Sequence, residues 1–226
     1  WFQPLPDKEY FLHIDLAQKH DHCAVAIAHV DKWVNMKVGN EYAQTAPVVV
    51  VDAVRYWTPT ASKSVDFTEV KDYIVSLKQR GFNLKLSTFD RWNSHDMMQQ
   101  LKGYGVNTEL LSVAKKHYED FALIIAEERV KGPAIQLLID EMLQLRIIRD
   151  RVDHPRKGSK DLADAVCGAI YNAMYHSKRT ENKEVEIHTF RELQRDNYLE
   201  EMEKQQKQNN VVRPPRRMPE ELADAL

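Results

Sequence analysis

Residues 10–30 read YFLHIDLAQKHDHCAVAIAHV and contain two apolar runs separated by a polar turn. Each run has the length and composition of a short β-strand, so residues 10–16 and 24–30 are predicted to form a hairpin. Side chains alternate between the two faces of a strand, which places Asp15 on the same face as His13. A carboxylate therefore ends the strand that begins the fold.

Working outward from this hairpin, strand-like and helix-like patterns alternate. The β-branched run at 48–51 indicates a buried strand, and the spacing of Phe67, Val70, Ile74 and Leu77 is helical. Further strands are predicted at 47–57, 84–89, 106–111 and 147–152, and helices at 67–80, 93–102, 118–130, 134–145 and 161–176. A hairpin followed by β-α units predicts an α/β fold with a mixed central β-sheet flanked by helices.

Composition excludes several classes of protein. The sequence has 226 residues, the length of one domain with or without a tail. A net charge of −2 excludes a globally basic nucleic-acid-binding protein, but it is compatible with local basic patches. Cys23 and Cys167 are too few for a disulfide framework and indicate a reducing compartment. No apolar run approaches the roughly 18 residues of a membrane span, so no membrane partner is expected.

The chain is expected to divide into a body and a tail. It starts at Trp1 with neither a signal peptide nor an initiator methionine, which indicates an artificial start or a piece cut from a longer chain. Residues 10–176 form the predicted globular body. Residues 177–226 are rich in charge and lack glycine, and we predict a solvated helix at 186–208 followed by a linker at 209–217.

Three aspartates stand at the ends of predicted elements. Asp15 ends the first strand, Asp90 follows a central strand, and Asp161 opens the last helix. Asp164 lies three residues after Asp161, so both carboxylates can point towards one site. Carboxylates that converge raise each other's pKa and stay ionised together only beside a cation. Oxygen ligands favour Mg²⁺ or Mn²⁺ over Zn²⁺, and two such ions can hydrolyse a phosphodiester.

Each aspartate also has an ordinary structural interpretation. An aspartate at a strand end is commonly a turn residue. Asp161 could favour the positive end of its helix, with Ser159 as the N-cap, and Asp164 could be solvated. Asp15 fits this interpretation least, because burying a lone carboxylate within an apolar strand is costly.

A basic run leads directly into Asp161. Besides His154, it contains Arg146, Arg149, Arg151, Arg156, Lys157 and Lys160. Positive charge beside an acidic cluster suits the binding of phosphates. A solvated loop is the alternative interpretation of the same residues.

Other chemistries find little support. His20, His22 and Cys23 form a cluster without a second half at zinc spacing. The sequence contains neither a G-x-x-x-x-G-K-[ST] phosphate-binding loop nor a G-x-S-x-G nucleophile motif. Cys167 lies among alanine and glycine residues and is interpreted as a packed small residue.

Three segments resemble the nuclease domain of the large terminase subunit of tailed bacteriophages. They are HIDL at 13–16, FDRWNS at 89–94 and DHPRKGSKDLADA at 153–165. The last segment is the most specific, and the resemblance spans about residues 8–176.

The resemblance implies an RNase H-like fold, similar to RuvC-type resolvases and retroviral integrases. It implies that Asp15, Asp90 and Asp161 are the catalytic acids and metal ligands. Asp164 would be an accessory acid, either a further metal ligand or a group that supports the ligands, and Lys160 would contact phosphate or orient an acid. Members of the family use Mg²⁺ or Mn²⁺ and cut double-stranded DNA with little sequence preference, at the start and the end of genome packaging.

The family also implies partners. An ATPase motor domain precedes the nuclease domain in the full-length protein, so residues 1–9 would end an interdomain linker and ATPase activity is not expected of this chain. Double-stranded DNA, the motor domain, the portal protein and the small terminase subunit are the implied partners. The implied location is the host cytoplasm, transiently at the procapsid.

Two other functions are compatible with these residues. One is a RuvC-like, structure-selective nuclease of the same fold. The other is an interaction module that docks the packaging motor to the portal and cuts only weakly.

Overall fold

The computed structural model of the chain describes residues 2–17, 22–38, 42–60, 62–90, 94–155 and 158–179. Several predictions concern residues outside these ranges. They are the turn at 18–21, the centre of the FDRWNS segment at 91–93, the basic residues Arg156 and Lys157, and the tail helix and linker at 186–217.

The centre of the fold is a six-stranded mixed sheet. Its strands are β1 (Tyr10–Asp15), β2 (Cys23–Val38), β3 (Tyr42–Trp57), β4 (Leu84–Phe89), β5 (Thr108–Leu110) and β6 (Val130–Lys131), in the order β5-β4-β1-β2-β3-β6. Strand β1 pairs with β2 in antiparallel and with β4 in parallel orientation. The predicted hairpin and the predicted mixed sheet are both confirmed.

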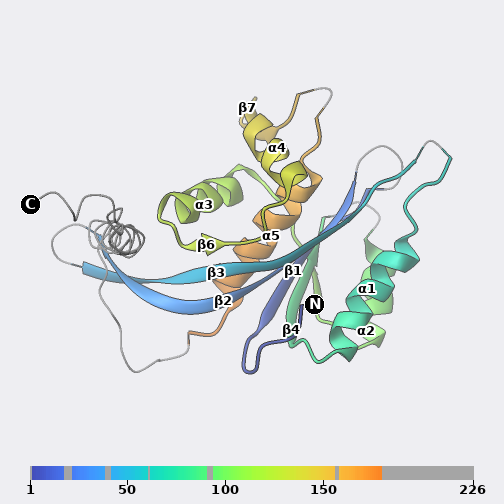
Figure 1. The fold of residues 1–226 in the computed structure, drawn as a ribbon, viewed down its shortest axis with the longest axis horizontal. Coiled ribbons are helices and arrows are strands. Elements are labelled where there is room, and N and C mark those ends of the chain that lie inside the picture. The colour runs from blue at the N-terminus through green and yellow to red at the C-terminus, as the bar shows by residue number, and fades with distance from the viewer. Residues whose placement is uncertain are drawn as a thin grey trace, which may run out of the picture.

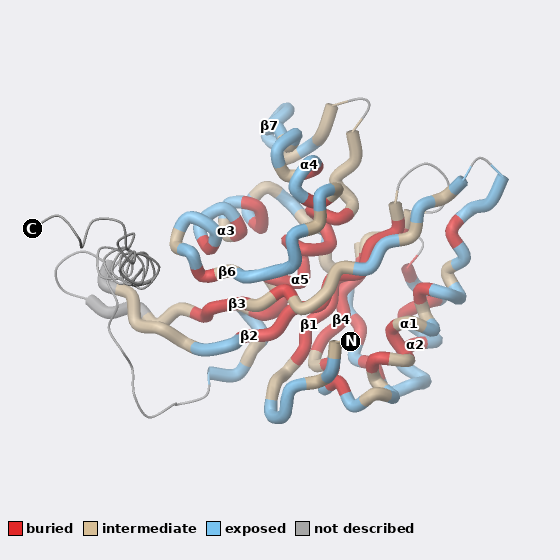
Figure 2. The backbone as a smooth tube through the Cα atoms, viewed as in Figure 1, coloured by how far each residue is buried: buried red, intermediate tan, exposed pale blue. Residues whose placement is uncertain are grey.

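Helices cover both faces of the sheet (Figure 1). Helices α1 (Phe67–Gln79) and α2 (His95–Gly103) pack on one face, and α3 (Lys115–Ala126), α4 (Gln136–Gln144) and α5 (Asp161–His176) pack on the other. The alternation along β1 sends Tyr10, Leu12 and Ile14 towards α1 and α2, and Phe11 towards α5. Both β1 and α5 are consequently buried along most of their length (Figure 2). Within the described ranges, no helix is long and apolar enough to cross a bilayer.

Strands β2 and β3 are longer than predicted. Their antiparallel pairing continues from the core out to Val38 and Tyr42. Polar residues such as Asp31 and Lys32, both exposed, interrupt the apolar pattern there, although backbone hydrogen bonds between the two strands do not require apolar side chains. The short strand β6 on the edge of the sheet was not predicted.

The single strand predicted at 147–152 is wrong. This segment is a separate two-stranded hairpin of β7 (Arg146–Ile148) and β8 (Arg151–Asp153). Arg149 and Asp150 form its turn with φ values of 50° and 64°, the left-handed region in which glycine or asparagine is usual. The turn therefore carries no glycine signal, and its alternating flanks resemble one continuous strand.

Helix α5 lies close against β1 because its inner face is made of small residues. A Cβ atom on Gly168 would lie 2.3 Å from the His13 ring, so only glycine permits this approach. Asn172 donates hydrogen bonds to the Leu12 carbonyl oxygen (2.9 Å) and to Thr88 Oγ1 (2.6 Å), and Thr88 Oγ1 also hydrogen-bonds His13 Nδ1 (2.8 Å). These contacts attach α5 to β1 and β4 at residues that precede the carboxyl ends of the two strands.

Candidate functional site

Asp15 and Asp90 lie side by side at one edge of the sheet. Ile14 of β1 is the register partner of Phe89 of β4, and the strands are parallel, so the residue after each pair emerges at the same edge. The Asp90 backbone N–H also donates to the Ile14 carbonyl oxygen (3.4 Å). The fold thus joins two aspartates that are far apart in the chain.

The first turn of α5 brings Asp161 and Asp164 to the same edge. The Asp161 Oδ2 atom accepts a hydrogen bond from the backbone N–H of His22, at 2.8 Å. His22 immediately precedes β2, whose Ala24 is the register partner of Asp15. All four aspartates singled out in the sequence therefore gather at one corner of the molecule.

Asp15 is the carboxylate whose surroundings are most negative. It is partly buried, and no residue in the described ranges donates a hydrogen bond to its carboxylate. Burial raises the pKa of Asp15 well above its usual range, and the negative charges of Asp164, Asp161 and Asp90 raise it further. The positive charge of Lys160 opposes this rise. A cation at this corner would relieve the repulsion.

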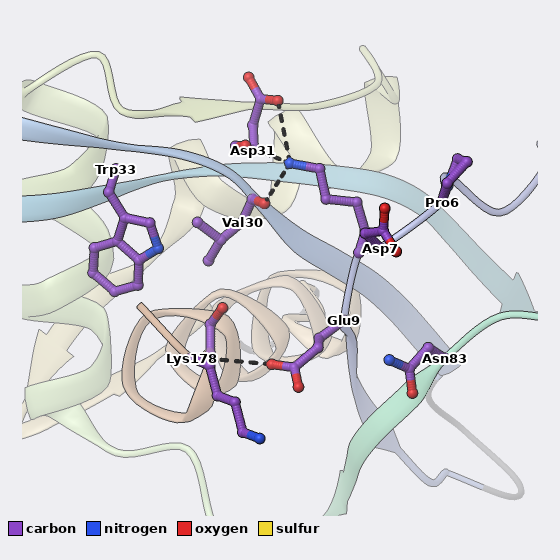
Figure 3. A pocket seen from close by; sticks show the side chains of 10 residues that line it. Pro6, Asp7, Glu9, Val30, Asp31, Trp33, Asn83 and Lys178 are labelled. Atoms are coloured by element: carbon purple, nitrogen blue, oxygen red, sulfur yellow. Dashed lines mark hydrogen bonds and ion pairs between the residues drawn. The ribbon is translucent and has the colours of Figure 1, made fainter. Parts of the chain in front are cut away.

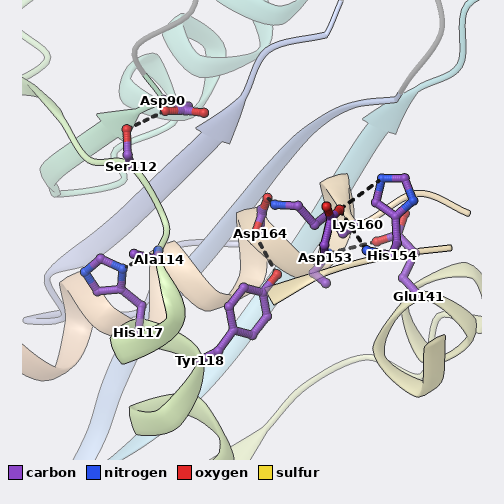
Figure 4. A network of polar contacts seen from close by, with 11 residues as sticks. Asp90, Ser112, Ala114, His117, Tyr118, Glu141, Asp153, His154, Lys160 and Asp164 are labelled. Carbon is purple, nitrogen blue, oxygen red and sulfur yellow. Dashed lines mark hydrogen bonds and ion pairs between the residues drawn. The ribbon is translucent and has the colours of Figure 1, made fainter. Parts of the chain in front are cut away.

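Asp164 is held by two side chains (Figure 4). Tyr118 Oη of α3 donates to Asp164 Oδ1 at 2.6 Å, and Lys160 Nζ forms an ion pair with Oδ2. Burial raises the pKa of Asp164, and the Lys160 and Tyr118 contacts counter that rise. Burial also raises the pKa of Tyr118, as does Asp164, so its hydroxyl stays a donor.

Lys160 is the cation built into the cluster. Burial lowers its pKa, but the neighbouring carboxylates of Asp164 and Asp15 raise it overall, so the ammonium group stays charged. Its ion pair with Asp164 places the ammonium group beside that acid. Among the described residues, the charge of Lys160 is the one that opposes the negative charges acting on Asp15.

Two further observations bear on the structural interpretations of the aspartates. Ser112 Oγ donates to Asp90 Oδ1 at 2.7 Å (Figure 4). Lys160, not Ser159, occupies the N-cap position of α5, so the alternative in which Ser159 caps Asp161's helix does not hold. Tyr118, which donates to Asp164, and Glu141, which accepts the backbone N–H of Ala163, were not predicted, because buried polar residues inside amphipathic helices carry no motif of their own.

The carboxylate oxygens of these four aspartates are of the type that binds a hard divalent cation. Carboxylate oxygens are the ligands that Mg²⁺ and Mn²⁺ prefer. In the described ranges, however, no three His, Cys, Asp or Glu side chains lie close enough to enclose an ion. Asp90, Asp161 and Asp164 each accept a hydrogen bond from the protein. Burial raises the pKa of the Cys23 thiol to about 12, which disfavours a thiolate zinc ligand here.

Three arginines of the basic run lie on the surface of the protein. Arg146, Arg149 and Arg151 are exposed on the β7–β8 hairpin, which leads through residues 153–160 into α5. Lys115 of α3 contacts Asp150 in the hairpin turn at 2.5 Å, which ties the hairpin to the body of the fold.

A cavity of about 470 Å³ lies at the opposite end of β1 (Figure 3). Its lining includes Lys8, Glu9, Trp33 and Lys178. None of the residues predicted to form the site lines it.

Comparison with known proteins gives one relative by sequence and several by structure. No family model matches the chain. The uncharacterized protein MJ0330 of Methanocaldococcus jannaschii is 28% identical over 184 residues, covering 76% of this chain and 31% of that protein. The chain thus spans about a third of the length of this curated relative.

Among solved structures, the large terminase nuclease from the thermophilic phage G20c has a TM-score of 0.57 at 15% identity, over 75% of this chain and 84% of that one. A second structure of that nuclease contains bound magnesium. The large terminase nuclease domain of Thermus phage P74-26 also has a TM-score of 0.57 at 15% identity, over 80% and 87%. The large terminase of bacteriophage HK97 has a TM-score of 0.54 at 15% identity, over 74% and 40%.

These likenesses establish the fold. The chain has the architecture of large terminase nuclease domains, and the expected RNase H-like fold is confirmed.

Proposed function

We propose that this chain is a metal-dependent endonuclease that cuts double-stranded DNA during viral genome packaging. The observation that carries the proposal is the convergence of Asp15, Asp90 and Asp161 at one corner of a fold shared with terminase nucleases. The low sequence specificity and the roles at the start and end of packaging follow from the resemblance.

The carboxylates have distinct positions that suggest distinct roles. The negative charges of Asp164, Asp161 and Asp90 all act on Asp15, so Asp15 would contact both ions, Asp90 would hold one, and Asp161 with Asp164 would hold the other. Bound there, two Mg²⁺ or Mn²⁺ ions would activate the attacking water and stabilise charge on the leaving oxygen. The magnesium bound to the G20c nuclease supports this choice of metal.

The protein's own residues prepare this chemistry. Tyr118 holds one oxygen of Asp164, while Lys160 holds the other and keeps positive charge beside the carboxylates. Lys160 would lose part of this contact to an incoming phosphate or cation, because either competes for the same charges. Ser112 holds Asp90 in place by donating a hydrogen bond to one of its carboxylate oxygens.

The basic run would bind the DNA backbone. Arg146, Arg149 and Arg151 are exposed on the hairpin that precedes α5, and Arg156 and Lys157 follow in the chain. Contacts to phosphates position DNA without reading its sequence, which agrees with low specificity.

The biological setting is part of the proposal. The chain covers 40% of the HK97 large terminase, and it covers 40% of a further large terminase from a thermophilic bacteriophage. We propose that it works beside an ATPase motor domain, with the portal protein and the small terminase subunit as partners, in the host cytoplasm.

Cleavage of supercoiled plasmid by the purified chain tests the proposal. We expect nicking and linearisation with Mg²⁺ or Mn²⁺, no cleavage with EDTA, and loss of cleavage in Asp15→Ala and Asp161→Ala. The matched control is Glu9→Ala, at the other end of β1. Cleavage by both aspartate variants at the parent rate would contradict the assigned site.

A four-way junction offered together with linear duplex separates the main proposal from a structure-selective nuclease. We expect no strong preference for the junction. A strong preference would replace the packaging function with a resolvase-like one.

A further inference from the structure

Glu141 is a buried carboxylate that the proposed chemistry does not use. It lies on α4, and only 3% of its surface is exposed. Its two oxygens contact two different parts of the chain: Oε2 accepts the backbone N–H of Ala163 at 2.9 Å, and Oε1 accepts the Ser159 hydroxyl. Because protein donors satisfy both oxygens, Glu141 faces the protein and not a ligand.

These two contacts enclose the turn that carries the acids. Ser159 and Ala163 flank Lys160 and Asp161, and Asp164 follows directly after Ala163. The first N–H groups of a helix have no partner within the helix, and lysine at the N-cap position is a donor that cannot accept them. Glu141 supplies the missing acceptor from another helix and places negative charge at the positive end of α5.

The same turn is held from a second direction. Tyr118 of α3 donates to Asp164, so α3 fixes one side of the turn while α4 fixes the other. A movement of the turn would shift Asp161 and Asp164 together relative to Asp15, which is attached to the sheet.

We infer that Glu141 is a positioning residue that sets the place of the first turn of α5, and thereby the affinity of the carboxylate corner for divalent cations. The inference rests on the proposed nuclease function. A residue that only caps a helix would change stability, whereas a positioning residue changes metal affinity beyond any change in stability.

The test compares Glu141→Gln with Leu138→Ala in the 226-residue chain. Glutamine keeps the shape but offers only one acceptor and no charge. Leu138 lies on the same helix and is buried against the same core, and its truncation removes packing without removing an acceptor. For each variant, Tm is measured in EDTA, Mn²⁺ affinity by calorimetry, and cleavage as a function of Mn²⁺ concentration.

We expect Glu141→Gln to weaken Mn²⁺ binding by about tenfold or more, the effect typical of residues that orient metal ligands, and to raise the Mn²⁺ concentration for half-maximal cleavage equally. The rate at saturating Mn²⁺ should fall less. Leu138→Ala should lower Tm as much or more and leave Mn²⁺ affinity within about twofold of the parent. Ser159→Ala, a milder change, should shift Mn²⁺ affinity in the same direction by a smaller factor.

Equal Mn²⁺ affinities in Glu141→Gln and the parent, or equal shifts in Glu141→Gln and Leu138→Ala, would overturn the inference. If Glu141→Gln does not fold, the Ser159→Ala result decides, and an unchanged affinity there has the same meaning. If the parent chain binds Mn²⁺ and cleaves DNA, but Glu141→Gln and Leu138→Ala shift the Mn²⁺ affinity equally, only the positioning role is refuted. A parent chain that neither binds Mn²⁺ nor cleaves refutes the proposed function and this inference together.

Discussion

The two ends of β1 are both polar but are arranged in opposite ways. Where the strand begins, acidic groups lie beside basic ones. Glu9 accepts the backbone N–H of Lys178 (Figure 3). Glu9 also contacts Lys85 at 3.3 Å, and Lys8 contacts Asp31 at 3.8 Å. Where the strand ends, Asp15 faces three other aspartates, and Lys160 is the cation that opposes their charge. Among the residues that the structure describes, charge is balanced where β1 begins and unbalanced where it ends.

The end of β1 with paired charges is arranged for stability, whereas the end that bears Asp15 is arranged for chemistry. Paired surface charges contribute little to stability and also cost little. A cluster of like charges beside a buried strand is costly unless something else neutralises it. Conflict between a local arrangement and stability is expected at functional sites, and the end of β1 that bears Asp15 shows such a conflict.

Of the substitutions considered, Asp161→Asn should reduce DNA cleavage most. Asp161→Asn removes one charge from the unbalanced end, and we expect Mn²⁺-dependent plasmid cleavage to fall by about 100-fold or more, since even residues that only orient ligands are worth about 10- to 100-fold. Glu9→Gln, at the balanced end, should leave the rate within about twofold. Equal losses in the two variants would remove the distinction between the ends.

A second effect concerns stability and pH. The folded-state pKa of Asp15 is raised by burial and by Asp164 and Asp161, so the folded protein holds this proton at pH values where the unfolded chain has lost it. In EDTA, the free energy of unfolding should therefore decrease as pH rises from about 4 through the raised pKa, by about 1.4 kcal/mol for each pH unit that separates the folded-state from the unfolded-state pKa.

Asp15→Asn cannot titrate, so it should show a smaller decrease, of which the rest comes from the raised pKa of Asp164, and it should unfold at a higher temperature than the parent at pH 8 without metal. Mn²⁺ should then stabilise the parent and not the variant. Thermal denaturation across pH 4 to 9 measures both effects. An Asp15→Asn variant with the parent's pH profile would show that Asp15 does not carry the repulsion.

A third prediction concerns the affinity for duplex DNA. Replacement of Arg146, Arg149 and Arg151 by glutamine should weaken duplex binding, and the slope of log K against log salt should become less steep by about 2 to 3, since each phosphate contact contributes about −0.9. Lys85→Gln, at the balanced end, is the control. An unchanged slope in the triple variant, measured by fluorescence anisotropy, would favour a solvated hairpin.

The smallest expected effect concerns the hydroxyl of Tyr118. Tyr118→Phe removes one donor from Asp164 but leaves Lys160 in place, so we expect cleavage to fall by about three- to tenfold, in line with one hydrogen bond of about 0.5–1.5 kcal/mol. Cleavage rates at saturating Mn²⁺ measure the change. A loss as large as that of Asp161→Asn would give Tyr118 a more direct role than support.

The sequence predicted much of this fold because β1 and α5 have local patterns that agree with their surroundings. Helix α5 has the predicted bounds, since small residues such as Gly168 and Ala169 pack closely against β1. Hairpin β7–β8 was misjudged because its turn uses arginine and aspartate where glycine is usual. Local patterns therefore predicted packed elements better than strained turns.

The candidate site shows a similar division. Asp15, Asp90 and Asp161 stand at element ends, where sequence patterns are informative, and the parallel pairing of β1 with β4 brings two of them together. The supporting residues Tyr118 and Glu141 lie inside helices, and their partners are 46 and 22 residues away along the chain. Only the packing of three helices on the sheet defines those contacts.

Crystals of the 226-residue chain soaked in Mn²⁺ would test the central claim most directly. We predict anomalous difference density within about 2.5 Å of carboxylate oxygens of Asp15 and Asp161, with Asp90 or Asp164 completing the ligands. Density elsewhere, or the absence of density at saturating Mn²⁺ while these aspartates keep their contacts to His22, Ser112 and Tyr118, would contradict the account.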